Sequence, residues 1–377
     1  MKEKWKENKG AVIVVGGSIL ISVLFVFLLV TSVGNPGTSA QVDAADVGIM
    51  DKFDMFMTNT ISDSLDGILA IEKVYWLNDD DLVAPEPNPS GYGESTDPKA
   101  MKGLLERAAD LIGEDRMYFD PETTELAPNS KILYYLDETI FAITWKEVQN
   151  MSTYCFSEVF IAHPSQFRRF LAGGEYGSEK QFVTTEMAAS VNAVVASSGD
   201  FYRFRNFGTI VYDGKVQRIR SENIDTCFID DKGDLIFTYR GEITDIHEAQ
   251  KFVDDNHIRF SVAFGPILVD NGIRCEPREY YLGEIKDDYP RAALCQMGEL
   301  HYLLATANGE GYYTRTPNIY GFAEVIAATG CEKAYTLDGG QTAVIAMNDQ
   351  LINAVLFGFQ RRISDIIYFA TAVPNGG

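Results

Sequence analysis

The chain has 377 residues, of which 46% are hydrophobic, an ordinary share for a globular protein with a sizeable core. Its formal net charge of −22 argues against nucleic acid as a partner, because nucleic-acid binding needs a basic surface. The same charge predicts that any anionic substrate is held by a local cluster of arginines, since the surface as a whole repels it.

The N-terminal segment, residues 1–40, has the pattern of a membrane anchor. Residues 11–33 contain no charged side chain, and a helix of that length would rise about 35 Å, enough to span the hydrocarbon core of a bilayer. Four lysines precede the run and place the N-terminus in the cytoplasm. We therefore expect a single-pass protein of the cell membrane whose main domain is extracellular. The alternative is a signal peptide cleaved near residues 38–40.

Residues 41–130 are predicted to form a membrane-proximal, partly helical segment. Between residues 50 and 71 the apolar side chains recur at helical spacing, with polar and acidic residues between them. Residues 84–98 are rich in proline and glycine, which indicates a loop. A second amphipathic helix is expected over 99–113, ending at Gly113.

From residue 131 onward the pattern changes to short apolar runs separated by glycine-containing turns, which indicates strands and hairpins. We take 131–377 as the main domain. Asp213-Gly214 and Lys232-Gly233 are the clearest hairpin turns. The strands expected are 132–136, 140–145, 154–162, 194–197, 209–212 and 235–239, with one helix over 186–191.

A polar turn interrupts two apolar runs near the C-terminus. Residues 335–337 and 343–347 are predicted to be buried strands, and Asp338-Gly339-Gly340-Gln341-Thr342 lies between them. The turn is either a plain hairpin, since Asp-Gly favours one, or a site in which a carboxylate, backbone amides and a hydroxyl meet a ligand.

Further polar groups follow or precede buried runs elsewhere in the domain. They include Ser198-Gly199-Asp200, then Arg291, and then Arg361 with Ser364 and Asp365. An arginine beside a strand is often a salt-bridge partner. Two arginines near glycine turns also suit an anion clamp, because guanidinium binds phosphate bidentately.

Familiar catalytic and metal-binding signatures are absent from the sequence. There is no HExxH or GxSxG motif, and four histidines do not suggest a histidine-rich metal site. The five cysteines include no CxxC pair, and we expect them to be small buried residues or, in an extracellular domain, to include one disulfide. No cofactor is indicated with certainty; a divalent cation such as calcium, held by carboxylates, is the candidate.

Taken in order, these motifs resemble the phosphodiester glycosidase family, which contains the "uncovering enzyme" and bacterial exopolysaccharide-related members. The resemblance covers residues 159–372. Three positions depart from the family pattern: Ser198 replaces an asparagine, and Gln341 and Thr342 replace a glycine and a serine. The segments that carry the resemblance are 198–202, 208–215, 263–272, 290–293, 322–342 and 361–366.

The resemblance implies an α+β fold with a mainly antiparallel sheet, flanking helices, and the polar turns gathered at one end. It implies a hydrolase that cleaves a sugar-1-phosphodiester bond in cell-envelope or exopolysaccharide material. The alternatives are a non-catalytic ectodomain that binds cell-wall polymer and a scaffold protein of envelope assembly. The expected partners are a phosphorylated glycan and, through the N-terminal helix, the membrane.

The same resemblance assigns roles to the polar turns. Arg291 and Arg361 would hold phosphate, and Asp338 and Asp200 would act as base or contact sugar hydroxyls. The substrate-binding groups expected beside them are Ser198, Gly199, Gly339, Gly340, Thr342, Ser364 and Asp365.

Overall fold

The computed structural model describes residues 77, 82–200, 202–221, 224–276, 287–310 and 315–373. The predicted anchor at 11–33 and the predicted helix at 50–71 lie outside them. Within the described part of the chain, no helix combines the length and apolar character needed to cross a bilayer. The anchor therefore stays a prediction.

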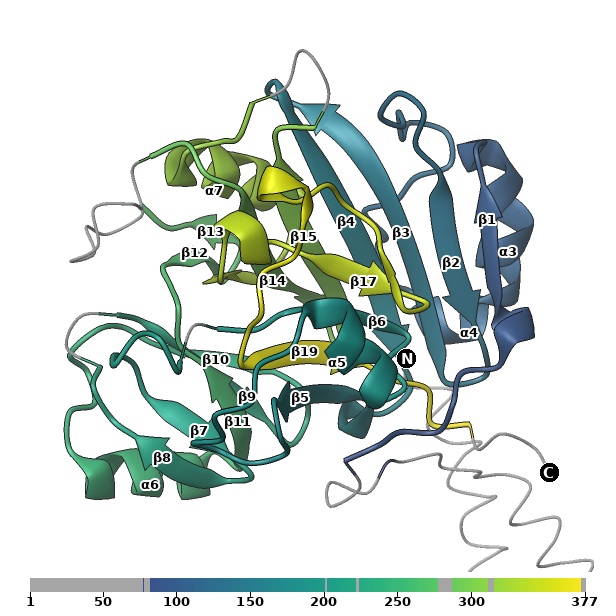
Figure 1. The fold of residues 1–377 in the computed structure, drawn as a ribbon. Helices are drawn as coiled ribbons and strands as arrows, with labels where there is room; N and C mark the ends of the chain where they lie inside the picture. The colour runs from purple at the N-terminus through teal and green to yellow at the C-terminus, as the bar shows by residue number, and fades with distance from the viewer. Residues whose placement is uncertain are drawn as a thin grey trace, which may run out of the picture. The chain divides into compact units, whose positions relative to one another are not determined.

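A nine-stranded sheet forms the centre of the domain (Figure 1). Every strand pairing in it is antiparallel. In spatial order the strands are β1 (Tyr92–Ser95), β2 (Ile132–Leu136), β3 (Ile140–Gln149), β4 (Ser152–Ile161), β15 (His301–Asn308), β14 (Arg291–Gly298), β16 (Lys333–Leu337), β12 (Ile267–Asp270) and β13 (Ile273–Arg274).

Two smaller antiparallel sheets, of five and of three strands, pack against one face of this sheet. The five-stranded sheet runs β18 (Gln350–Leu351), β17 (Ile345–Met347), β6 (Val195–Ser198), β19 (Asp365–Phe369) and β5 (Phe167–Leu171). The three-stranded sheet runs β10 (Leu235–Thr238), β9 (Thr226–Asp230) and β11 (Ile258–Val262), and β7 (Ile210–Tyr212) pairs with β8 (Lys215–Arg218).

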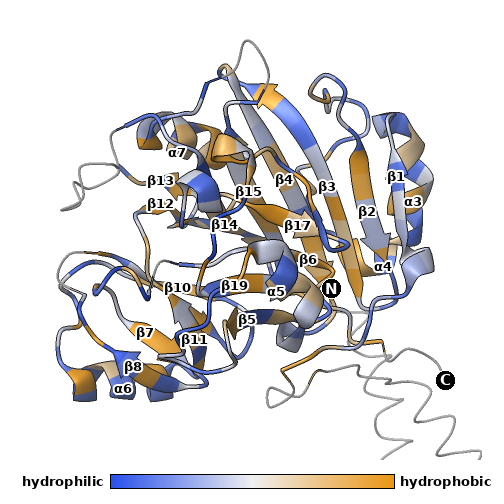
Figure 2. Ribbon diagram, viewed as in Figure 1, coloured by the Kyte–Doolittle hydropathy of each residue, from blue (hydrophilic) through white to orange (hydrophobic). Residues whose placement is uncertain are grey.

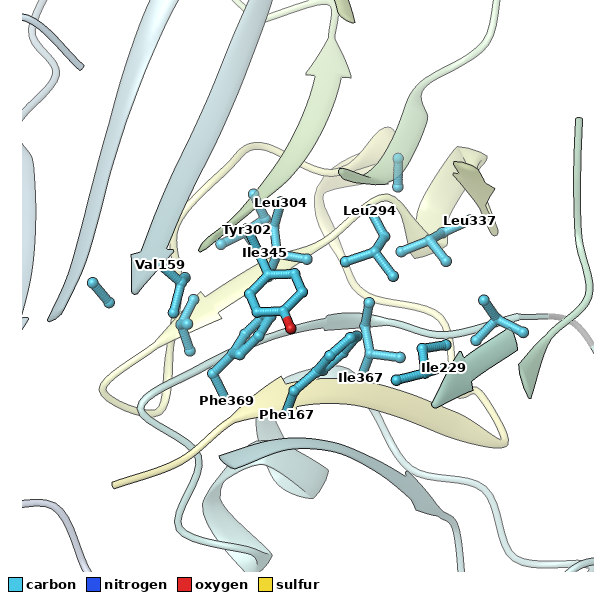
Figure 3. Close-up of a cluster of buried hydrophobic side chains, with 14 of the residues drawn as sticks. Val159, Phe167, Ile229, Leu294, Tyr302, Leu304, Leu337, Ile345, Ile367 and Phe369 are labelled. Atoms are coloured by element: carbon cyan, nitrogen blue, oxygen red, sulfur yellow. The ribbon is translucent and has the colours of Figure 1, made fainter. Parts of the chain in front are cut away.

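The main hydrophobic core fills the space between these sheets (Figure 3). Phe167 on β5 lies at a junction of three sheets. Its ring packs on Phe369 of β19, Phe260 of β11 and Tyr302 of β15, with ring centroids 4.8, 5.4 and 4.9 Å away. Because all four rings are buried, the sheets are joined by apolar burial as well as by chain connections.

Helices cover the outer faces. A second core, which includes Trp145, Phe156 and Phe322, lies between the other face of the nine-stranded sheet and the helices α3 (Lys102–Arg107), α4 (Ala109–Ile112) and α7 (Ile319–Ala328). Helix α5 (Thr184–Ser190) packs on the five-stranded sheet, and α6 (Ile246–Asp255) packs beside β8 and β11. Both faces of the central strands are thus covered, and Figure 2 shows apolar residues along strands of the smaller sheets such as β17 and β7.

The α+β fold with mainly antiparallel sheets is therefore confirmed. The hairpins predicted at Asp213-Gly214 and Lys232-Gly233 connect β7 to β8 and β9 to β10. The helix predicted over 99–113 is instead two short helices, interrupted at Ala108, whose ψ of 3° is not helical; it ends at Gly113 as expected, with φ +62°. The five cysteines are free, and all except the half-buried Cys275 are buried.

The boundary placed near residue 130 does not coincide with a boundary in the structure. Strand β1, at residues 92–95, pairs with β2 in the nine-stranded sheet, and residues 74–377 form one compact unit. The proline and glycine content of 84–98 indicated a loop. An edge strand tolerates such residues, because only one of its sides needs hydrogen bonds.

Candidate active site

The polar turn after β16 is not a hairpin. Strand β16 belongs to the nine-stranded sheet, whereas β17, which comes after the turn, pairs with β6 and β18 in the five-stranded sheet. The turn, which includes the short 3-10 helix η5 (Gly340–Thr342), therefore connects two sheets. This is the first indication that the turn has a role beyond reversing the chain.

Asp338 and Arg291 meet at one edge of the main sheet. Strands β14 and β16 are antiparallel, with Ala292 opposite Leu337. Continuing this register by one residue places Arg291 opposite Asp338, so that both side chains lie on the same face. A cleft of about 440 Å³ lies there, and Asp338, Arg291 and Arg361 all line it.

Each glycine of the turn is required for a different reason. A Cβ atom on Gly339 would lie 2.6 Å from the Pro290 carbonyl oxygen, which is too close for any side chain. Gly340 has φ +68°, a conformation that glycine adopts readily, and its amide donates to the same oxygen at 2.8 Å. The backbone is thereby held against the residue that precedes Arg291.

Two further donors of the turn are used within the turn itself. The Gly339 amide donates to Oδ1 of Asp338 at 2.9 Å, and the Thr342 hydroxyl donates to the Gly339 carbonyl at 2.6 Å. The prediction that Gly339, Gly340 and Thr342 contact substrate is not tested by this geometry. What they do in this structure is hold Asp338 in place.

Asp338 has the properties of a proton-transfer group. Its side chain is 7% exposed, and Oδ2 has no hydrogen-bond partner among the described residues. Burial raises the pKa of Asp338 to about 6, although the Thr342 hydroxyl and the guanidinium groups of Arg361 and Arg205 oppose the shift. A carboxyl group with a pKa near neutrality can accept or release a proton under physiological conditions.

Three arginines line the cleft. Arg291 donates from Nη2 to the Asp287 carbonyl at 2.6 Å. Arg205 lies over the Phe264 ring at 4.1 Å, and Arg361 lies over a second aromatic ring at 5.3 Å. Arg205 was missed in the sequence, although it falls within the stretch 193–208 that carries the first polar turn. In a chain of net charge −22, this concentration of guanidinium groups favours an anionic ligand.

Asp200 and Asp365 lie in a buried ion cluster rather than among the cleft-lining residues. Nη2 of Arg169 is 2.9 Å from a carboxylate oxygen of each, and Nε donates to Asp365 at 3.0 Å. All three side chains are fully buried. Burial raises the pKa of Asp365, and the Arg169 guanidinium opposes the shift.

Backbone amides complete the cluster. Asp200 accepts hydrogen bonds from the amides of Tyr202 and Ala263, at 2.8 and 2.7 Å, and its own amide donates to Asp365 at 3.1 Å. A Cβ atom on Gly199 would lie 1.9 Å from Oδ2 of Asp365, so the chain can pass the cluster only with glycine there.

The ion cluster is connected directly to the cleft. The Asp338 amide donates to the Gly199 carbonyl at 3.1 Å, and the Gly199 amide donates to the Asp365 carbonyl at 3.1 Å. Ser198 and Ser364 flank this connection, and both are buried away from the cleft lining. The sequence-predicted residues thus form two adjacent groups, one in the cleft and one behind it.

Cation binding gains no support from the geometry. Among the described residues, no group of three or more histidine, cysteine or acidic side chains is arranged to hold a metal ion. The paired carboxylates of Asp200 and Asp365 face Arg169 instead. Calcium stays a prediction.

Fold and site together define an antiparallel α+β domain with an arginine-lined cleft around one buried carboxyl group. Residues 191–370 match the family model for phosphodiester glycosidase, and this range contains every residue of the candidate site except Arg169. This part of the chain therefore belongs to the phosphodiester glycosidase family, and the resemblance seen in the sequence is confirmed.

Three solved structures are similar to the chain. The catalytic domain of zebrafish N-acetylglucosamine-1-phosphodiester alpha-N-acetylglucosaminidase, auto-inhibited by its pro-peptide, is 18% identical, with 62% of this chain and 83% of that one covered and a TM-score of 0.47. A hypothetical protein from Synechocystis is 14% identical, with 62% of each chain covered and a TM-score of 0.44. A putative exported protein from Burkholderia pseudomallei is 11% identical, with 58% and 74% covered and a TM-score of 0.39. No curated protein matches the sequence.

The raised pKa of Asp338 predicts a pH-dependent gain of stability in Asp338→Asn. Ionising this carboxyl costs more in the folded than in the unfolded chain, so the wild type loses stability as pH rises from about 4 to about 6. Asparagine carries no such charge. Above pH 6 the variant should be the more stable, by up to about 3 kcal/mol, and the difference should vanish near pH 4.

Urea unfolding at several pH values measures this difference, with Asp213→Asn at an exposed turn as the matched control. A wild type that remains more stable than Asp338→Asn at pH 8 would show that the carboxylate is stabilised in the fold, contrary to the burial argument.

Proposed function

We propose that the cleft around Asp338 hydrolyses a sugar-1-phosphodiester, releasing the sugar from its phosphate. One observation carries the proposal: a buried carboxyl group with an unpartnered oxygen and a raised pKa shares a cleft with Arg205, Arg291 and Arg361. The family of residues 191–370 supports the same class of reaction.

The arginines would stabilise the negative charge of the phosphate leaving group. When the bond between the anomeric carbon and the phosphate oxygen breaks, the electron pair stays on that oxygen and the phosphate gains a second negative charge. Guanidinium groups in a partly dehydrated cleft stabilise this developing charge. A phosphate monoester is already a good leaving group, so a strong general acid is not required.

Asp338 would act on the attacking water. As the anomeric carbon becomes positively charged, the carboxylate stabilises it and takes one proton from the water that forms the new carbon–oxygen bond. Oδ2 suits this role, since Oδ1 is already held by the Gly339 amide.

Asp200 and Asp365 would act as positioning residues. They fix Gly199 through Arg169 and the backbone, and Gly199 in turn accepts the hydrogen bond from the Asp338 amide. Direct contact of Asp200, Ser198 or Ser364 with substrate would require the cleft to open further than in this structure.

Asp338→Asn tests the proposal and separates it from the alternative of a non-catalytic polymer-binding ectodomain. With a panel of methyl esters of sugar 1-phosphates, wild-type turnover should fall about tenfold per pH unit below about 6, because only the ionised carboxyl acts as a base. The variant should turn over at least about a hundredfold more slowly and bind nearly as well.

Asp365→Asn is an unsuitable control here because it disturbs the ion cluster, so Asp213→Asn, at an exposed turn outside the cleft lining, should be used instead. If wild type and Asp338→Asn bind a glycan equally and neither cleaves any ester of the panel, the enzyme proposal fails and the binding ectodomain is favoured.

We further propose that the enzyme is a membrane-anchored, extracellular protein acting on envelope or exopolysaccharide glycans. The uncharged run 11–33, preceded by lysines, supports this topology. Protease added to intact cells should remove the domain beyond residue 40 and leave a small membrane stub; full protection of the domain would contradict the orientation.

Calcium dependence, the remaining proposal, is measured in the same ester assay with and without chelator.

A further inference from the structure

A second cavity, of about 520 Å³, lies between the β5 edge of the five-stranded sheet and the β11 edge of the three-stranded sheet. Figure 1 shows these two strands side by side, with the β7–β8 hairpin next to them. Among the described residues, none lines both this cavity and the Asp338 cleft. Its volume is within the range of small-molecule sites, about 300–1,000 Å³. The cavity is therefore a candidate site separate from the cleft.

Arginine side chains connect the two strands that form the cavity. Nη1 of Arg259, on β11, donates to the carbonyls of Pro164 and Phe167 at 3.0 and 3.2 Å. In the other direction, Nη1 of Arg169 on β5 donates to the Ser261 carbonyl on β11. A backbone ladder would hold the strands about 4.8 Å apart. Because long side chains join them instead, space for a ligand remains between the two edges.

The lining of this cavity is positively charged. It contains Arg168, Arg169 and Arg259 but, in the part of the chain that the structure describes, one acidic side chain, Asp213, which is 70% exposed at its hairpin turn. Arg169 is already paired with the carboxylates of the ion cluster. Arg168 is 6% exposed, so its charge acts in partly dehydrated surroundings, where attraction is stronger than in water. In a chain of net charge −22, such a lining favours an anionic ligand.

Two tyrosine hydroxyl groups accompany these arginines. Tyr368 of β19 is directly opposite Arg168 in the strand register, so both side chains lie on one face of the sheet, and Tyr212 of β7 lines the same cavity. Burial raises the pKa of both tyrosines, and the positive charge of the nearby arginines opposes the shift. Both hydroxyl groups therefore stay protonated and can donate hydrogen bonds to an anion.

We propose that this cavity binds a small organic phosphate, whose phosphate group is held by Arg168, Arg259 and the two tyrosine hydroxyl groups. A phosphate offers three terminal oxygens, which suit two guanidinium groups better than the two oxygens of a carboxylate do. Phe170 and Ile258 also line the cavity and supply apolar surface for the organic group. The inference does not depend on the hydrolysis proposed for the other cleft.

Calorimetric binding of phenyl phosphate to the full-length chain tests this site. The protein carries Arg291→Gln and Arg361→Gln, so that the other arginine-lined cleft does not contribute. Arg168→Gln should weaken binding at least about tenfold, the scale of one charge-assisted hydrogen bond. Arg168→Lys should weaken it less, because lysine keeps the charge but not the guanidinium fork. The matched control is Arg274→Gln, at an exposed position outside the cavity, with a change of less than about twofold expected.

A second variant keeps the test independent of the stability of Arg168→Gln. Tyr212→Phe removes one hydroxyl group from a half-buried ring and should weaken binding about threefold, the scale of a neutral hydrogen bond. Urea unfolding shows whether each variant is folded. Benzyl alcohol, which has the ring but no phosphate, should not bind.

Binding that is equally strong in the parent, Arg168→Gln and Tyr212→Phe would overturn the site, and so would equal binding of benzyl alcohol or no binding of phenyl phosphate at all. The chain itself offers one competing source of anionic groups, since Asp79, Asp80 and Asp81 precede Leu82, which lines the cavity. If phenyl phosphate binds only when Asp79→Asn, Asp80→Asn and Asp81→Asn are combined, the cavity serves the chain's own carboxylates, and the proposal of a free organic phosphate fails.

Discussion

The buried ion cluster of Arg169, Asp200 and Asp365 is the constraint on which the site depends. It joins β5, β19 and the chain after β6, and it reaches β11 through a hydrogen bond from Arg169 to the Ser261 carbonyl. Removing one partner of such a cluster leaves an uncompensated buried charge, which typically costs about 3–5 kcal/mol, whereas an apolar replacement of the whole cluster can be neutral. The role of the cluster here is to position the backbone: Gly199 is hydrogen-bonded to Asp365, and the amide of Asp338 is hydrogen-bonded to Gly199.

The contrast between the two carboxyl environments explains why Asp338 and not Asp200 is suited to chemistry. Asp200 faces a guanidinium group and two backbone amides, so both of its oxygens are engaged. Asp338 keeps one oxygen without a hydrogen-bond partner among the described residues and lies in a cleft whose arginines only partly offset its burial. The chain carries a net charge of −22, so this local concentration of positive charge is the feature that would attract an anionic ligand.

Prediction from the sequence succeeded where the signal is local. Strand β2 was predicted at residues 132–136, its observed bounds, and the hairpin turns were identified from Asp-Gly and Lys-Gly. Asp338, Arg291 and Arg361 were chosen as candidates from the glycines and strand ends beside them, and the structure places all three in the lining of one cleft. Arg169 was missed because its partner Asp365 is 196 residues away, and nothing near it in sequence signals a buried ion pair.

Bond cleavage at the anomeric carbon, rather than at phosphorus, is the central feature of the proposed mechanism, and it can be measured directly. Hydrolysis of a sugar-1-phosphodiester in water enriched in oxygen-18, followed by mass spectrometry of both products, reports which atom the water attacked. The mechanism predicts the label on the released sugar and none on the phosphate monoester. Label on the phosphate would mean that the arginines and Asp338 serve a phosphodiesterase, and it would contradict the mechanism derived from the cleft.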